Sequence, residues 1–247
     1  MATRTKTEAK PADVRGKIVD ALMKLAGEGR FEDISIRDIC KEGGITLVDF
    51  RESFPSKGAV LAGLSRRIDQ TVLAQNGEEL SDESPRERLF DILMRRLEAM
   101  APYREGLREA SAWIRRDPRA ALAMNQVVLG SMRFMLEAAD IELGDGAAGA
   151  IKLQGLALAW ARIVKVWLDD DDPGLSKTMA ELDRELTRGE RAAANVDRIN
   201  SLAAPFRTLV QAAFEARRPR ERRRRTRPEA ETEHADGPEQ GDQGPGA

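Results

Sequence analysis

Three features of the sequence predict an all-α fold for this chain of 247 residues. Apolar residues recur at intervals of three and four along most of the chain, which is the spacing of helices that bury one face. Several of these segments begin with a Ser or Thr followed three residues later by Asp or Glu, the capping box that satisfies backbone N–H groups at a helix start. No segment shows sustained alternation of polar and apolar residues, so we expect no sheet.

The first two predicted helices lie close together near the N-terminus. The buried face of the first helix is marked by Val14, Ile18, Leu22 and Leu25. The second helix covers 35–42 and opens with the Ser35 and Asp38 capping box. Gly43-Gly44 ends it, because glycine readily adopts the positive φ that a sharp turn requires.

The third predicted helix covers 47–53 and opens with a second capping box, Thr46 and Asp49. Phe50 and Phe54 are four residues apart and share its inward face. Two short helices joined by Gly-Gly-Ile form a helix-turn-helix, in which the second helix is held so that it can enter the major groove of DNA. We expect the small core that holds it to contain Ile36, Ile39, Cys40, Ile45, Phe50 and Phe54.

The remainder of the chain also has helical spacing. Further helices are expected over 57–75, from Ser84 until Pro102 interrupts, and over 103–115, 118–139, 147–168, 174–189 and 191–217. Asp117-Pro118, Gly144-Asp145-Gly146 and the 169–174 segment separate several of them. Pro205 is expected to kink the last helix rather than end it.

Residues 14 to about 62 resemble the N-terminal domain of the TetR family of transcriptional regulators. The matching elements are Gly29-Arg30-Phe31, Ile36, Ile39, Gly44-Ile45 and Phe54-Pro55-Ser56-Lys57. The resemblance implies an all-α homodimer with a three-helix DNA-binding domain at 13–58 and a larger helical domain for dimerisation and ligand sensing at 59–217. Residues 1–12 are then expected to be a disordered basic arm, and 218–247 a disordered Arg-rich and then acidic tail.

The resemblance makes double-stranded DNA the expected partner. The residues expected to contact it are Arg15, Arg37, Thr46, Leu47, Val48, Arg51, Glu52, Ser53 and Lys57. Arg51 stands where the family commonly carries a phosphate-binding Tyr, and Leu47 and Val48 stand where it carries Lys, Gly or Thr. Residues 1–60 hold eleven Lys or Arg and ten Asp or Glu, a small excess for binding that depends on phosphate neutralisation.

Two functions therefore stay open. The first is a transcriptional repressor that binds a palindromic operator as a dimer and is released by a small apolar effector. The alternative is a protein of the same fold that does not bind DNA and instead binds a lipid or a protein partner. Residues 166–186 weakly resemble a lipid-binding protein family of ubiquinone biosynthesis that shares the TetR fold without acting as a repressor.

The C-terminal helices offer candidates for an effector pocket and a dimer interface. The pocket candidates are Trp113, Met132, Met135 and Trp160, with ordinary core packing as the alternative for each. Residues 147–161 are dense in Ala and Gly, which lets helices approach closely. We expect them to form a dimer interface with 191–217, and packing within one chain is the alternative.

The composition excludes several kinds of site. Cys40 is the single Cys and His234 the single His, so neither an intrachain disulfide framework nor a Cys/His zinc site or catalytic triad is available. We read the acidic run 169–172 as a loop that caps the next helix, with a cation site as the alternative. The sequence predicts no catalytic residues, no metal and no cofactor, and therefore no enzyme.

The remaining expectations concern the compartment and the basic tail. Uninterrupted apolar runs are shorter than the roughly 18–20 residues of a membrane span, and the N-terminus lacks the apolar core of a secretory signal. We therefore expect a cytoplasmic protein without a membrane partner. The segment 217–227 holds eight Arg and one Glu, which suits either added nucleic-acid affinity or a solvated tail neutralised by the acidic residues after it.

Overall fold

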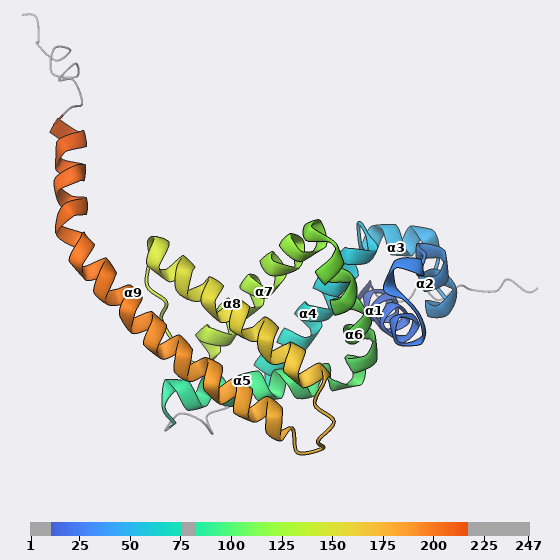
Figure 1. Ribbon diagram of the computed structural model, residues 1–247. Helices are drawn as coiled ribbons and strands as arrows, with labels where there is room; N and C mark the ends of the chain where they lie inside the picture. The colour runs from blue at the N-terminus through green and yellow to red at the C-terminus, as the bar shows by residue number, and fades with distance from the viewer. Residues whose placement is uncertain (1–10, 76–82, 217–247) are drawn as a thin grey trace, which may run out of the picture. The chain divides into compact units, whose positions relative to one another are not determined.

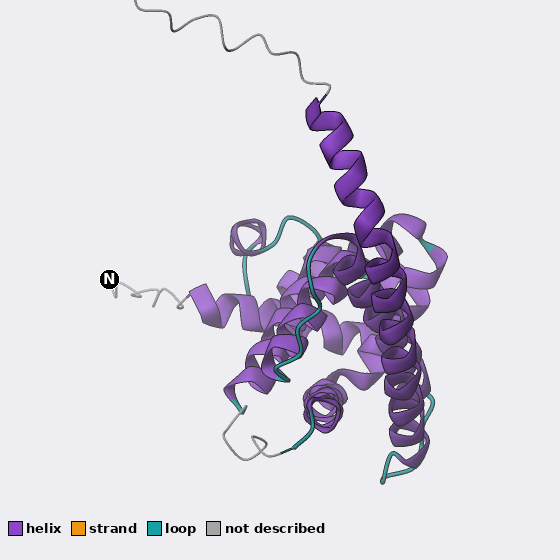
Figure 2. Ribbon diagram, turned by 90° about the vertical axis from the view of Figure 1, so that its left-hand side faces the viewer, coloured by secondary structure: helices purple, strands orange, loops and turns teal. Residues whose placement is uncertain are grey.

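The computed structural model describes residues 11–75 and 83–216, and every element in these ranges is a helix (Figure 2). The prediction of an all-α fold is confirmed. The elements are α1 (Pro11–Glu28), η1 (Phe31–Asp33), α2 (Ile36–Gly43), α3 (Leu47–Ser53), α4 (Lys57–Ala74), α5 (Pro85–Met100), η3 (Ala101–Tyr103), α6 (Arg104–Arg116), α7 (Pro118–Ala138), α8 (Gly146–Leu168) and α9 (Ser176–Ala216). Nearly all of the basic arm and the whole of the C-terminal tail lie outside the described residues.

Two boundaries differ from those expected. α1 begins at Pro11, two residues before the expected start of the DNA-binding domain, because proline is well tolerated in the first turn of a helix. The segments 174–189 and 191–217, predicted as two helices, form the single helix α9. Gly189 does not break it, since a helical glycine costs only about 1 kcal/mol relative to alanine. The helix also continues through Pro205, as expected.

The chain divides into two compact units, residues 1–200 and 201–247. In the first unit α1, α2 and α3 gather at one end, and α4 leads from them to the helices α5, α7 and α8 (Figure 1). Around α1 to α3 the buried core is formed by Ile18, Leu22, Ala26, Phe31, Ile39, Cys40, Phe50 and Phe54. Ile36, expected in this core, is 37% exposed, because it is the first residue of α2 and its side chain faces outward there.

The same apolar core continues into the larger group of helices. Trp160, Ile163 and Trp167 of α8 are buried there. They pack with residues from α5 and α7, including Leu97 and Met135. α8 is the one described helix long and apolar enough to cross a membrane by length and composition. One face of it lies in this core, and the other faces solvent.

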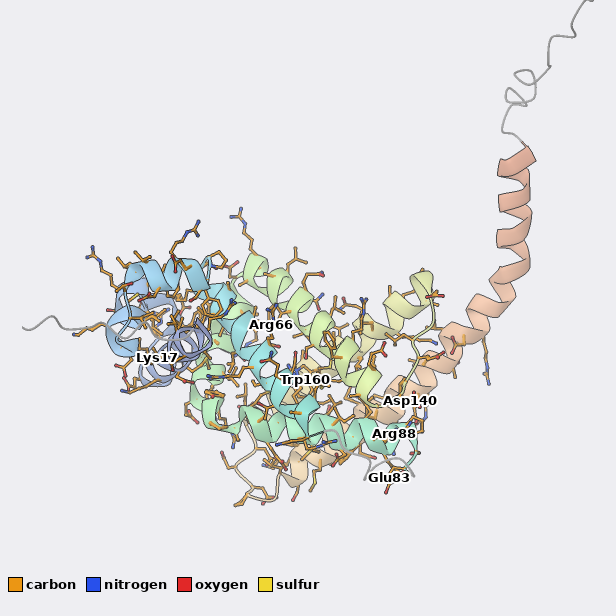
Figure 3. All side chains as sticks on the ribbon, turned by 180° about the vertical axis from the view of Figure 1, so that it is seen from behind. Lys17, Arg66, Glu83, Arg88, Asp140 and Trp160 are labelled. Atoms are coloured by element: carbon orange, nitrogen blue, oxygen red, sulfur yellow. The ribbon has the colours of Figure 1, made fainter. Side chains whose placement is uncertain are left out.

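Polar contacts hold the ends of these helices together. The Arg88 guanidinium near the start of α5 donates to the carbonyl oxygens of Ala139 and Glu83, each at 2.9 Å (Figure 3). Arg104 of α6 donates to the Trp167 carbonyl at 2.7 Å, close to the end of α8. Arg162 of α8 pairs with the buried carboxylate of α9 Glu185 at 2.8 Å. The contacts of Arg88 with Ala139 and of Arg104 with Trp167 join segments that lie more than fifty residues apart in the sequence.

The acidic run between α8 and α9 is a capping loop, as predicted. The buried carboxylate of Asp170 accepts hydrogen bonds from the backbone N–H and the hydroxyl of Thr178, at 2.9 and 2.7 Å. Asp172 accepts from the backbone N–H groups of Gly174 and Ser176. These donors lower the pKa of both carboxyl groups, with the hydroxyls of Thr178 and Ser176 as the largest causes.

Candidate nucleic-acid interface and sensor cavity

The turn between α2 and α3 is fixed by local hydrogen bonds. Ser35 and Asp38 form the predicted capping box at the start of α2. Gly44 ends the helix with φ of +60° and ψ of 36°, a left-handed conformation in which a side chain would be strained. The Ile45 N–H then donates to the Cys40 carbonyl at 3.0 Å. The chain therefore leaves α2 in a defined direction.

α3 is fixed equally well. The Thr46 N–H and hydroxyl donate to the Asp49 carboxylate at 2.8 and 2.7 Å, and the Asp49 N–H donates back to the Thr46 hydroxyl at 3.1 Å. Phe50 and Phe54 are both buried against the core. The carboxylate of Asp49 therefore holds the helix start, and the two phenylalanines hold the opposite face.

The outward face of α3 is mixed in character. Leu47 is 52% exposed and Val48 is 64% exposed. Arg51 and Glu52 are also exposed, whereas Ser53 is half-buried. Neither Arg51 nor Glu52 forms an ion pair within the described part of the chain. The face thus combines two apolar side chains, one available cation and one carboxylate.

Lys57 was expected to contact DNA, and the structure places its ammonium in a different role. The Lys57 Nζ donates to the carbonyl oxygens of Phe31 and Ile34, at 2.5 and 2.8 Å. It also lies 4.7 Å from the centre of the Phe31 ring. Burial lowers the pKa of Lys57. Its charge is used to hold the η1 segment against the start of α4.

The other expected cations lie on α1 and α2. Arg15 is exposed and its guanidinium lies over the Phe54 ring, 4.7 Å from the ring centre. Arg37 is exposed on α2 and has no ion pair among residues 11–75 and 83–216. Lys17, by contrast, pairs with Asp13 at 2.8 Å. Of the cations expected to contact DNA, Arg15, Arg37 and Arg51 therefore remain available to phosphates.

α6 is packed directly against α1 and η1 of the N-terminal helices. Trp113 stacks on Phe31, with ring centres 4.7 Å apart. The Arg116 guanidinium pairs with Glu32 at 2.9 Å. At the other end of α6, Gly106 allows close approach to α1, since a Cβ added there would lie 2.5 Å from the Met23 carbonyl oxygen. A movement of α6 would therefore also shift α1 and η1.

The opposite side of α6 borders an apolar cavity of about 310 Å³, at the lower end of the range for small-molecule pockets. Side chains of α4, α5, α6, α7 and α8 line it. The apolar ones include Leu61, Leu64, Ile68, Met100, Leu107, Ile114, Met124, Val128, Trp160 and Val164. A wider and more polar cleft of about 630 Å³ lies between α1 and the η3–α6 segment.

The four residues proposed for an effector pocket are not brought together. Trp160 lines the cavity and lies among the helices of the larger group (Figure 3). Trp113 stacks on Phe31 instead. Met132 and Met135 are fully buried in the core and are not among the lining residues. Periodicity distinguishes buried from exposed positions but cannot say which buried side chain borders a void.

Arg96 is the feature of the cavity that sequence reasoning missed. It is 3% exposed, and its guanidinium pairs with the Asp69 carboxylate. It donates to the Ser65 hydroxyl at 3.2 Å and lies 5.2 Å from the centre of the Trp160 ring. The sequence did contain an indication, since Arg96 occupies a position on the apolar face of α5. A charged side chain buried there needs a partner inside the protein.

Comparison with solved structures identifies the fold. A TetR transcriptional regulator from Nitrosomonas europaea ATCC 19718 is similar with a TM-score of 0.58 and 21% identity, over 71% of this chain and 97% of that chain. A TetR transcriptional regulator from Rhodococcus sp. RHA1 is similar with a TM-score of 0.51 and 16% identity, over 72% of this chain and 96% of that chain. The chain has the TetR fold. No protein-family model matches the sequence, and no curated protein matches it.

Within this TetR fold, α8 carries an outward stripe of apolar and small residues. Ile151 is 57% exposed and Leu158 is 50% exposed, and Gly155 between them is also exposed. These positions lie three and four residues apart and so share one side of the helix. The Ala- and Gly-rich composition of 147–161 thus coincides with a solvent-facing surface of this chain.

Proposed function

We propose that this chain is a TetR-family transcriptional repressor that binds a palindromic operator as a homodimer. The observation that carries the proposal is α3, whose start is fixed by Thr46 and Asp49 while Leu47, Val48 and Arg51 face solvent. A helix held in this way can present its first turn to the major groove. The TetR fold of the chain supports the same role.

Each exposed side chain of α3 has a suitable target on DNA. Leu47 and Val48 can contact thymine methyl groups, and Glu52 can accept from cytosine N4. Arg51 neutralises a phosphate, and Arg37 and Arg15 do the same from α2 and α1. Lys57 is left out of this set, because its ammonium is bound to backbone carbonyls.

Homodimerisation follows from the same proposal. A palindromic operator is read by two copies of the motif related by two-fold symmetry. The exposed stripe of α8 at Ile151, Gly155 and Leu158 supplies a self-complementary apolar surface for that contact. Small residues in the stripe allow two copies of the helix to approach closely.

α6 provides the connection between effector and DNA. Leu107, Ala110 and Ile114 of this helix line the cavity, and Gly106 and Trp113 contact α1 and η1. An effector that binds one position of α6 more tightly than another shifts the population between two arrangements of the DNA-binding domain. Release from the operator then requires no contact between effector and DNA.

A gel-shift experiment with the DNA upstream of the protein's own gene tests the proposal. The purified chain is expected to give one discrete complex that survives an excess of unrelated competitor DNA. Arg51→Ala is expected to weaken that complex, whereas Arg119→Ala on α7, outside the proposed set of DNA contacts, is expected to leave it unchanged. Absence of a complex, or equal displacement by any DNA, contradicts the proposal.

One observation favours the alternative of a non-DNA-binding member of the fold. Leu47 and Val48 place two apolar side chains on the outermost face of α3, where a protein partner could cover them. A lipid is the other ligand considered for that alternative. A native mass spectrum of the purified chain, together with the gel shift, tests whether the chain binds a lipid instead of DNA. A retained lipid without a DNA complex supports this alternative, and a ligand-free dimer that shifts DNA excludes it.

A further inference from the structure

We propose that the cavity lined by α4, α5, α6, α7 and α8 binds an anionic amphiphile, a small monocarboxylate with an apolar chain or ring. Arg96 of α5 donates to its carboxylate. The inference deepens the proposed sensor role of the cavity and rests on it. It replaces the purely apolar effector expected from the sequence with one that carries a negative head group.

The apolar walls of the cavity are the reason for proposing a ligand with an apolar chain or ring. Most of its lining consists of apolar side chains from five helices, including the Trp160 ring. Burial of a hydrocarbon against such walls is favourable at about 25 cal/mol per Å² of apolar surface removed from water. A fully polar ligand would lose its hydration without gaining partners.

The polar part is indicated by the hydrogen-bonding groups of Arg96. One terminal nitrogen of its guanidinium is paired with Asp69, and the other donates to Ser65 at 3.2 Å. The third nitrogen, Nε, has no hydrogen-bond partner. An unpaired N–H in the interior is costly, so the site favours a ligand that brings an acceptor oxygen to it.

The charge of the surroundings favours an anion over a neutral acceptor. Asp69 is shared between Arg96 and the Ser131 hydroxyl, which donates to it at 2.8 Å. Burial lowers the pKa of Arg96 to about 10, because the guanidinium has lost water that one carboxylate does not replace. A second carboxylate beside Arg96 would restore part of that stabilisation.

Two further cations border the same cavity. Arg115 and Lys165 line it and are exposed, and neither is ion-paired within the described ranges. No Asp or Glu is among the described lining residues. The cavity therefore attracts an anion, and its described lining has no carboxylate to pair with the ammonium of an amine ligand.

Isothermal titration calorimetry of the full chain with matched ten-carbon probes tests the inference. Decanoate is expected to bind at least ten-fold more tightly than decan-1-ol, and decylamine is expected to show no binding. A shorter aromatic carboxylate, 4-phenylbutanoate, is the second acidic probe. Equal binding of acid and alcohol, or no binding of either carboxylate, would overturn the inference.

Two variants locate the head group. Arg96→Lys keeps a positive charge beside Asp69 but removes the Nε donor, and it is expected to weaken decanoate binding ten-fold or more while leaving decan-1-ol unchanged. The exposed pair Arg115→Gln with Lys165→Gln is expected to weaken decanoate several-fold and to reduce its salt dependence. Arg119→Gln, exposed on α7 and outside the cavity lining, is the matched control. Parent affinity in both test variants overturns the inference, even if Arg96→Lys is less stable.

DNA binding is measured separately on the same samples. Decanoate binding with the expected variant pattern, but without a DNA complex, contradicts the proposed repressor and leaves the anion site standing. A discrete DNA complex in a protein that does not discriminate decanoate from decan-1-ol supports the proposed repressor and contradicts the anion site. A fall in DNA affinity on addition of decanoate, absent in Arg96→Lys, supports both.

Discussion

Lys57 donates a hydrogen bond to the carbonyl oxygen of Ile34, with Nζ and oxygen 2.8 Å apart. The same ammonium also donates to the Phe31 carbonyl and lies over the Phe31 ring. The lysine that closes the helix-turn-helix segment thus ties the loop before α2 to the start of α4. This contact, rather than a phosphate, accounts for its position.

Replacement of Lys57 should therefore act on stability. Lys57→Met is expected to lower the free energy of unfolding by about 1–3 kcal/mol, because part-buried carbonyl groups lose their donor. Arg51→Met, at an exposed position of α3, is expected to change it by less than about 0.5 kcal/mol. Urea unfolding followed by circular dichroism measures both. A larger loss in Arg51→Met than in Lys57→Met would refute the assignment.

The role of Lys57 shows where prediction from the sequence ends. The capping boxes at Ser35 and Thr46 were predicted correctly, because each depends on residues only three positions apart. The partners of Lys57 lie more than twenty residues away, and nothing local to the lysine indicates them. Arg96 is similar, since its carboxylate partner is on another helix.

Gly106 should be intolerant of a side chain. A Cβ at this position would lie 2.5 Å from the Met23 carbonyl oxygen and 2.7 Å from the Met23 methyl carbon, so α1 and α6 would have to separate. We expect Gly106→Ala to destabilise the chain by about 1–3 kcal/mol, as overpacking does. Gly130→Ala on α7, where no atom lies within 4 Å, is the control and should be neutral or stabilising. Equal melting temperatures for the two variants would count against the close α1–α6 contact.

The proposed dimer interface can be disrupted at Leu158. Leu158→Glu places a charge at the C-terminal end of the exposed α8 stripe, and burying it in an interface is unfavourable. We expect a monomer by light scattering and a loss of DNA binding, since half-sites bind weakly alone. Leu122→Glu, also at an exposed apolar position but on α7, should remain dimeric. The interface assignment fails if Leu158→Glu stays a dimer.

Asp170 gives the fold a specific sensitivity to acid. Hydrogen bonds, chiefly from the Thr178 hydroxyl, lower the pKa of the Asp170 carboxyl below its ordinary value of 3.8. The stabilisation is therefore fully present above pH 3.8 and is lost as the pH falls through the lower, folded-state pKa. Asp170→Asn should melt at a lower temperature than the parent at neutral pH, and the gap should close in strong acid. A gap independent of pH would contradict this role of the carboxylate.

The α8 stripe and the cavity show a second limit of the sequence. The Ala- and Gly-rich segment indicated close packing, but only the fold shows that Ile151 and Leu158 face outward. In the same way, the sequence offered four candidates for lining an effector pocket, but only Trp160 among them borders the cavity. The periodicity of a helical sequence shows which residues share one face of the helix. Whether that face packs in the core, lines a cavity or is exposed depends on how the helices are arranged.

The central claim is that α3 reads DNA, and the salt dependence of binding tests it most directly. Fluorescence anisotropy with DNA from upstream of the gene would be measured across a range of salt concentrations for the parent and for Arg51→Ala. We expect parent binding to weaken steeply with salt, and Arg51→Ala to bind more weakly with a log–log slope smaller by about 1, as loss of one phosphate contact predicts. Absent binding, or binding by the parent that is insensitive to salt, would contradict the account.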